Sequence, residues 1–217
     1  EAINSGTIIG LADNARNLEN TGKLTGGLHN SANVENSGQI SGEISNTDTG
    51  IINNSGTITA ESGTNAGNID GGNFIVNGQF ENSATGTMRA HLTNNGNFTN
   101  EGELNVLDGS NNQIITGTGN TYIWGNFNNT GSIDQGLVEI KPDVTLENSG
   151  AIVADIENAG TIHNEATITG NIENSGDITT DITNIFGDIS NTGILNLTGT
   201  ESNSEITGDG TGVVNIN

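Results

Sequence analysis

The sequence predicts an all-β chain folded as a parallel β-helix, a solenoid of short three-sided coils of about 16 residues each. Three observations predict it: a short recurring phrase, aliphatic residues at a fixed spacing, and a longer repeat laid over both. The phrase is Asn, then Ser or Thr, then Gly, any residue and an aliphatic, as in Asn4-Ser5-Gly6-Thr7-Ile8. An apolar residue often lies two positions before the Asn, as in Leu18-Glu19-Asn20.

The aliphatic residues recur at a spacing that closes a small coil. Ile8, Leu24 and Ile40 lie sixteen residues apart, and so do Ile152 and Ile168. Three aliphatic positions fall within each such interval, joined by Asn and Gly. Successive side chains of a strand point to opposite sides, so each short strand turns one aliphatic inward. Three short sides per coil follow from this pattern.

A longer repeat of about 46 residues begins near Val34, Phe80, Phe127 and Ile172. Each block corresponds to about three small coils, or to two coils of about 23 residues. No composition break divides the chain, so we expect residues 1–217 to form a single β-solenoid domain. We interpret it as a piece of a longer array or as a mature processed subunit.

The composition excludes several classes of protein. The chain has 33 Gly, one Pro, no Cys and a formal net charge of −22. Such charge is typical of disorder, but regularly spaced Ile, Leu and Val favour strands. Without Cys there is no disulfide or thiolate–metal framework. No run is apolar enough to insert in a membrane as a helix, and the acidity argues against nucleic acid as a partner.

Stacking explains how so small a coil could fold. Ordering the backbone costs roughly 1–2 kcal/mol per residue, whereas each buried aliphatic contributes only about 1.5–3 kcal/mol. Asn tolerates left-handed backbone angles and Gly frees the next corner. Asn side chains stacked on one corner would form a hydrogen-bonded ladder, a structural role rather than a catalytic one. The predicted ladder comprises Asn20, Asn36, Asn54, Asn148, Asn158, Asn174 and Asn191.

Asn-Ser-Gly-Thr-Ile phrases in an acidic, Cys-free chain rich in Gly and Asn resemble the repeat regions of large bacterial surface proteins. These are the autotransporter passenger domains and the filamentous-haemagglutinin-like adhesins, which are β-strand repeat proteins. The resemblance covers nearly the whole chain. It implies a right-handed rather than left-handed β-helix, secreted or held at the bacterial cell surface. It also implies a role in adhesion, biofilm or fibre formation.

Glutamates that precede the Asn suggest one further site. Those sixteen residues apart would stack about 4.8 Å apart, where repulsion in water is only about 0.9 kcal/mol. A solvated acidic surface is therefore the favoured interpretation, and weak Ca²⁺ binding between coils is the alternative. No calcium-binding loop motif is present, and we expect no other cofactor. These glutamates are Glu19, Glu35, Glu147, Glu157 and Glu173.

Tyr122 and Trp124 are two residues apart, so on a strand they share one side. Pointing outward, they would form a platform for a sugar ring. Pointing inward, they would fill the coil. Phe74 and Val76 occupy the matching places of an earlier block, which favours packing.

The remaining motifs give no catalytic residue, and we expect no enzyme. His29, His91 and His163 have no metal-binding spacing, so surface or corner positions are expected. A polysaccharide-processing β-helix would need clustered carboxylates, whereas the Asp residues are scattered. Thr57-Ile58-Thr59 and Thr167-Ile168-Thr169 suggest an ice-binding surface but do not recur on consecutive coils.

The sequence therefore favours a structural and adhesive extracellular bacterial protein, an extended stalk or a self-assembling fibre. Uncapped end coils would be open sheet edges, so end-to-end self-association is expected. The alternatives are a carbohydrate-binding or polysaccharide-processing β-helix and an ice-binding solenoid. A localised function would lie where the phrase lapses, around Asn105 to Phe127.

Overall fold

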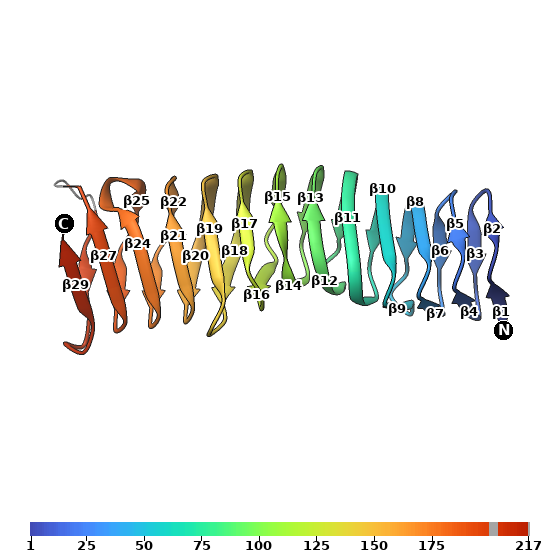
Figure 1. Cartoon of the computed structure of the whole chain (residues 1–217), viewed down its shortest axis with the longest axis horizontal. Coiled ribbons are helices and arrows are strands. Elements are labelled where there is room, and N and C mark those ends of the chain that lie inside the picture. Colours follow the sequence, from blue (N-terminus) through green and yellow to red (C-terminus); the bar gives the residue numbers. More distant parts are fainter. Residues whose placement is uncertain (200–203, 217) are drawn as a thin grey trace.

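The computed structural model, which describes residues 1–199 and 204–216, is an all-β parallel solenoid. It has about 12 turns of about 17 residues each. The coils stack into a straight rod with the two chain ends at opposite tips (Figure 1). With stacked strands about 4.8 Å apart, the rod is roughly 55–60 Å long. The predicted parallel β-helix is confirmed, with coils about one residue longer than the sequence spacing indicates.

Each coil has three sides, and the strands of successive coils pair in parallel on three faces of the rod. Face 1 contains β1 (Ala2–Asn4), β4 (Asn17–Asn20), β7 (Asn33–Asn36), β9 (Ile51–Asn54), the first parts of β11 (Asn68–Asn82), β12 (Thr87–Asn94) and β14 (Glu103–Asn111), β16 (Asn120–Ile123), the second parts of β18 (Ser132–Ile140) and β20 (Ala151–Asn158), β23 (Ile172–Asn174), β26 (Ile189–Asn191) and β28 (Ile206–Thr207).

Face 2 contains β2 (Thr7–Ile8), β5 (Lys23–Leu24), the first parts of β8 (Gln39–Asn46) and β10 (Thr57–Asn65), the middle of β11, the second parts of β12 and β14, β17 (Phe127–Asn129), β19 (Thr145–Asn148), β21 (Thr161–Asn164), β24 (Asp177–Asp181), β27 (Ile194–Thr198) and β29 (Val213–Ile216). Face 3 contains β3 (Ala12–Asn14), β6 (Leu28–Asn30), the second parts of β8 and β10, the end of β11, β13 (Asn97–Asn100), β15 (Ile114–Thr116), the first parts of β18 and β20, β22 (Ile168–Thr169) and β25 (Ile185–Phe186), preceded by a single 3₁₀ turn η1 (Ile182–Asn184).

Inward residues from the three faces form a continuous apolar core. Most strands alternate buried and exposed side chains, which places one residue per side in the interior, usually a large apolar one. The core is mostly Ile, Leu and Val, and in the middle of the rod it also contains Phe74, Phe80, Phe98 and Phe127, all of them buried. The Phe74 and Phe80 ring centroids lie 5.0 Å apart. Four of the aromatic residues concentrated in the middle of the sequence therefore fill the coil.

Buried asparagines form hydrogen-bonded ladders at the corners that follow each face. In a ladder, the side-chain amide of one coil donates to the side-chain oxygen of the next, as between Asn20 and Asn36 at 2.6 Å. Corner 1, after face 1, carries Asn4, Asn20, Asn36 and Asn54, then Asn158, Asn174 and Asn191 after an interval. Corner 2 carries Asn94, Asn111, Asn129, Asn148 and Asn164, and corner 3 carries Asn14, Asn30, Asn46, Asn65, Asn82 and Asn100.

The seven asparagines expected to share one corner thus lie on two. Six of them belong to corner 1, whereas Asn148 belongs to corner 2, between Asn129 and Asn164. In the interval on corner 1, Gly71 follows Asn54, and buried apolar residues take the ladder position on the next four coils. They are Ala90, Val106, Ile123 and Ile140.

The 46-residue repeat explains why the ladders change corners. The first block contributes eight sides, with inward residues Val34, Ile40, Ile44, Ile52, Ile58, Gly63, Ile69 and Phe74. Eight sides make two full coils and two further sides. A block therefore corresponds neither to three whole coils nor to two. Each block therefore begins one face earlier: Val34 on face 1, Phe80 on face 3, Phe127 on face 2 and Ile172 on face 1 again. Ladder positions repeat with the block, so they move from corner to corner.

The corner residues serve a different purpose from the one expected. Among the described residues, Asp143 is the only non-glycine residue with a positive φ, so the ladder asparagines are not left-handed. Glycines of the phrase such as Gly38 do not have a positive φ either. A Cβ on Gly38 would lie 2.1 Å from the Gly22 carbonyl oxygen of the previous coil. Gly is needed at this corner because the stacked backbones approach closely, and Asn because its amide both donates and accepts.

We predict that Gly38→Ala weakens the stack. The added methyl group must displace the neighbouring backbone, and overpacking of this kind typically costs about 1–3 kcal/mol. Gly6→Ala is the matched control, because it has the same place in the phrase and no atom lies within 4 Å of its added Cβ. Urea denaturation of both variants measures the difference. Equal stability of the two variants would contradict the close-approach argument.

Replacing one ladder residue should also destabilise the rod. The Asn82 amide donates to Asn100 Oδ1 at 2.8 Å and to the Gly86 and Glu103 carbonyls, and its own oxygen accepts from Asn65. Asn82→Ala leaves these buried groups without partners, for which we expect a loss of about 2–4 kcal/mol. Asn97→Ala, at an exposed position of the adjacent coil, is the control. A loss no greater than that of the control would show that the ladder is not stabilising.

Candidate functional site

A polar groove lies along the middle of face 1, where the side chains point to solvent. It has a volume of about 690 Å³ and is bordered by Asp70 of β11 at one end and Trp124 at the other. Asn68, Thr87, Glu103 and Leu107 complete its walls. A second hollow of about 730 Å³ continues from Asp70 toward the N-terminal tip, past Glu35 and Glu19.

The groove owes its straight outline to strand register. Asp70, Arg89, Asn105, Tyr122 and Glu139 pair one after another along face 1, one per coil. Their neighbours one residue before point inward and are buried, so alternation turns this column outward. These buried neighbours are Ile69, Met88, Leu104, Thr121 and Val138. Neighbouring members of the column lie about 4.8 Å apart.

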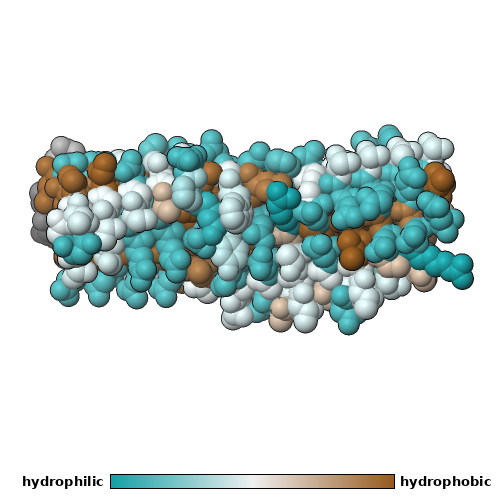
Figure 2. Space-filling view, turned by 90° about the horizontal axis from the view of Figure 1, so that it is seen from below, coloured by the Kyte–Doolittle hydropathy of each residue, from teal (hydrophilic) through white to brown (hydrophobic). Residues whose placement is uncertain are grey.

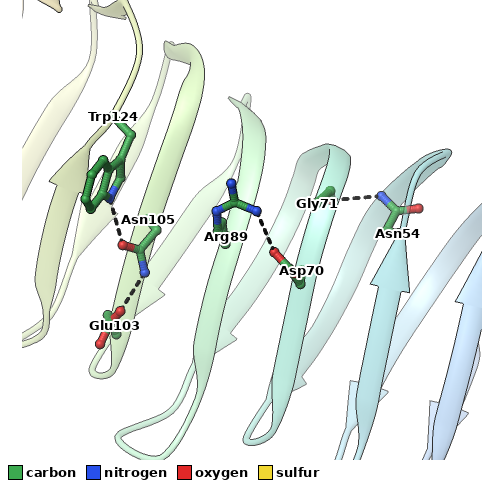
Figure 3. Close-up of polar contacts among 7 residues, drawn as sticks. All are labelled: Asn54, Asp70, Gly71, Arg89, Glu103, Asn105 and Trp124. Carbon is green, nitrogen blue, oxygen red and sulfur yellow. Dashed lines mark hydrogen bonds and ion pairs between the residues drawn. The ribbon is translucent and has the colours of Figure 1, made fainter. Parts of the chain in front are cut away.

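Hydrogen bonds connect the groove residues across coils (Figure 3). Arg89 Nη1 lies 3.1 Å from Asp70 Oδ1. Asn105 Nδ2 donates to Glu103 Oε1 at 2.6 Å, and Asn105 Oδ1 accepts from Trp124 Nε1 at 2.9 Å. The Asn105 side chain therefore donates through its nitrogen and accepts through its oxygen, and it holds the indole in a defined orientation.

Lys141 covers the two aromatic rings from the following coil. Its ammonium nitrogen lies 4.8 Å from the centroid of Trp124 and 5.2 Å from that of Tyr122, distances suited to cation–π attraction. The same nitrogen forms an ion pair with Glu139. Trp124 nevertheless stays 51% exposed. The ring is held in place and still presents surface to solvent.

Tyr122 and Trp124 point outward, which corrects the expectation that they pack inside the coil. The inward positions of this segment are Thr121 and Ile123, both buried. Comparison with Phe74 misplaced the segment by one residue, because Thr121 is the inward residue of that side. A role in glycan binding stays a prediction.

The charge of the groove differs from that of the rest of the rod. The chain has only four Lys and Arg residues in all, and two of them, Arg89 and Lys141, lie on this stretch of face 1. Each is paired with a carboxylate, Asp70 or Glu139. The groove thus combines an exposed ring, amide groups and compensated charges, which can donate and accept hydrogen bonds beside an apolar surface.

The predicted glutamates fall on two faces. Glu19 and Glu35 are in register on face 1, as are Glu157 and Glu173, whereas Glu147 lies on face 2 beside His163 at 2.9 Å. Among the described residues, no three His, Asp or Glu side chains are grouped so as to hold a metal ion. Weak Ca²⁺ binding remains a prediction.

The histidines and the Thr-x-Thr segments also have definite places. His29 lies 3.5 Å from Glu43 and His91 lies 2.8 Å from Asp108, so each contacts a carboxylate of a neighbouring coil, as His163 does. Thr57 and Thr59 lie on face 2, whereas Thr169 lies on face 3. The two Thr-x-Thr segments therefore do not form the single flat surface that the ice-binding hypothesis requires.

One carboxylate near the groove gives a prediction about pH. Hydrogen bonds from the Thr118 hydroxyl and from the Thr118 backbone N–H hold the pKa of Glu101 below its ordinary value. The ionised Glu101 side chain therefore stabilises the folded chain at neutral pH, and this stabilisation is lost as the pH falls through the lowered pKa. We expect Glu101→Gln to be less stable than the unsubstituted chain at pH 7, with the two converging in acid. Thermal melts against pH measure this.

Glu81→Gln, which removes an exposed charge on face 3, is the control for the change in net charge. A Glu101→Gln deficit that persists at low pH, or that Glu81→Gln reproduces, would contradict the role of the Thr118 bonds.

No protein-family model matches the chain, and neither the curated proteins nor the solved structures searched include a significant match. The described residues form no helix long and apolar enough to cross a membrane. What is established of this chain is its architecture, a β-solenoid repeat protein with one polar and aromatic groove on face 1.

Proposed function

We propose that the chain is a structural and adhesive rod of a bacterial surface, secreted or displayed outside the cell as an extended stalk or a fibre subunit. The observation that carries this proposal is the continuous parallel pairing of coils on the faces of the rod. A structure of this kind provides length, stiffness and a presented surface. The proposal involves no reaction.

Stiffness follows from the way neighbouring coils are joined. Backbone hydrogen bonds link each coil to the coils on both sides, and the buried amide ladders add side-chain bonds in the same direction. Bending the rod would stretch these bonds on one face and compress the closely stacked glycine corners on another. A solenoid with such contacts behaves as a one-dimensional stack of mutually dependent coils.

The composition of the surface is compatible with a location outside the cell. The repeated Asn, Ser, Thr and Gly give a polar exterior, and the net charge of −22 opposes aggregation side by side. The absence of Cys avoids unwanted disulfides in an oxidising medium. These properties agree with the resemblance to bacterial surface repeat proteins.

Both tips of the rod expose apolar side chains (Figure 2). At inward positions, Ile8 is 39% exposed at one tip, and Ile216 is 74% and Val214 43% exposed at the other. Their partners on the adjacent coil, Leu24, Leu197 and Leu195, are buried. The end strands also present unpaired backbone groups, which favour pairing with another strand. We therefore also propose that each tip stacks on a further coil, which belongs either to the same repeat array or to a second copy of the chain.

Electron microscopy of the purified 217-residue chain tests the proposal. We expect straight particles of constant width whose length grows with protein concentration. Ile8→Asp combined with Ile216→Asp places charges at inward positions of both tips, where a stacked coil would bury them, and should leave short single rods. Ile114→Asp, at an exposed position in the middle of face 3, is the control and should assemble as the unsubstituted chain does.

Flexible or globular particles would overturn the rod itself. Short rods at every concentration would overturn tip stacking between copies.

A further inference from the structure

From the groove on face 1, we infer a binding site for a neutral carbohydrate chain that lies along the rod from Asp70 to Trp124. Through this site the rod would adhere to its partner. Only this adhesive role rests on the proposed function. The single tryptophan of the chain would provide its apolar contact.

The aromatic end of the groove has the character of a sugar-stacking surface. Sugar rings have an apolar face of C–H groups, which packs on aromatic rings, while the ring hydroxyls bind polar groups around them. Trp124 is 51% exposed even though Asn105 and Lys141 hold it, so the groove presents a fixed ring without first having to order it. Such preorganisation reduces the entropy lost on binding.

The polar part of the groove supplies partners for hydroxyl groups at regular intervals. Asp70, Arg89 and Asn105 follow one another along face 1 at the coil spacing. Of the five N–H donors of a guanidinium group, the Arg89 side chain directs one at Asp70, at 3.1 Å. Carboxylate and amide oxygens beside it accept hydrogen bonds. An extended chain of hydroxyl-bearing rings could meet one such group at each coil.

The electrostatics favour a neutral ligand. Within the groove, the charge of Arg89 is compensated by Asp70, and Glu103 adds a further negative charge beside Asn105. The whole rod carries a formal charge of −22, which repels acidic polysaccharides and nucleic acids at long range. A purely apolar partner is disfavoured because six of the eight residues that line the groove carry polar or charged groups, which such a partner would leave without hydrogen bonds.

The test is calorimetric titration of the intact chain with neutral hexasaccharides, namely cellohexaose, mannohexaose, xylohexaose and chitohexaose, in parallel with an oligogalacturonate as an acidic probe. Emission of Trp124, the only tryptophan, follows the same titrations optically. We expect at least one neutral hexasaccharide to bind saturably and to shift this emission, and the acidic probe not to bind. Trp124→Ala and Arg89→Ala should each weaken binding at least about tenfold.

Phe186→Ala is the matched control, because it removes an exposed aromatic ring on face 3, away from the groove, and should bind as the unsubstituted chain does. Circular dichroism of every variant checks that the coils persist. Absence of binding to all four neutral probes would overturn the site, as would binding that Trp124→Ala leaves unchanged or tighter binding of the acidic probe.

These failures can be told apart from failure of the proposed function. Straight rods in the electron microscope without carbohydrate binding would remove the site and leave the stalk in place.

Discussion

The fold depends on one constraint: the backbones of successive coils must stack closely enough for parallel hydrogen bonds on three faces. At the corners this spacing leaves no room for a Cβ, and a methyl group on Gly38 would lie 2.1 Å from the carbonyl oxygen beneath it. Glycine therefore recurs at the same corner of successive coils. The same constraint selects asparagine, because a buried side chain stacked on copies of itself must both donate and accept along the rod, and a primary amide does so.

The repeat and the coil have different periods, and the structure accommodates both. A block contains eight sides while a coil contains three, so equivalent positions move back one face with each block. A buried corner can therefore be filled by Asn54 in one coil and by Val106 a few coils later. Each ladder ends on another partner, as where Asn54 Nδ2 donates to the Gly71 carbonyl at 3.2 Å (Figure 3). The rotation distributes polar ladders and apolar corners around the rod.

Sequence spacing alone predicts the three-sided parallel coil, because aliphatics such as Ile152 and Ile168 recur wherever a strand turns inward. It could not assign faces, since loops of different length separate the sides, and Asn148 was therefore grouped with the wrong corner. Trp124 was misplaced for a related reason: a shift of one residue exchanges inward and outward side chains. The partners Arg89 and Asp70 were missed, because residues nineteen apart meet only once coil lengths are known.

The central claim is that buried amide ladders bond neighbouring coils along the rod. Hydrogen exchange of side-chain amides, followed by NMR on a uniformly ¹⁵N-labelled chain, tests it most directly. We expect the Asn82 side-chain amide, which is fully buried and bonded on both sides, to exchange far more slowly than that of exposed Asn97. Equally fast exchange of the two amides would contradict the account.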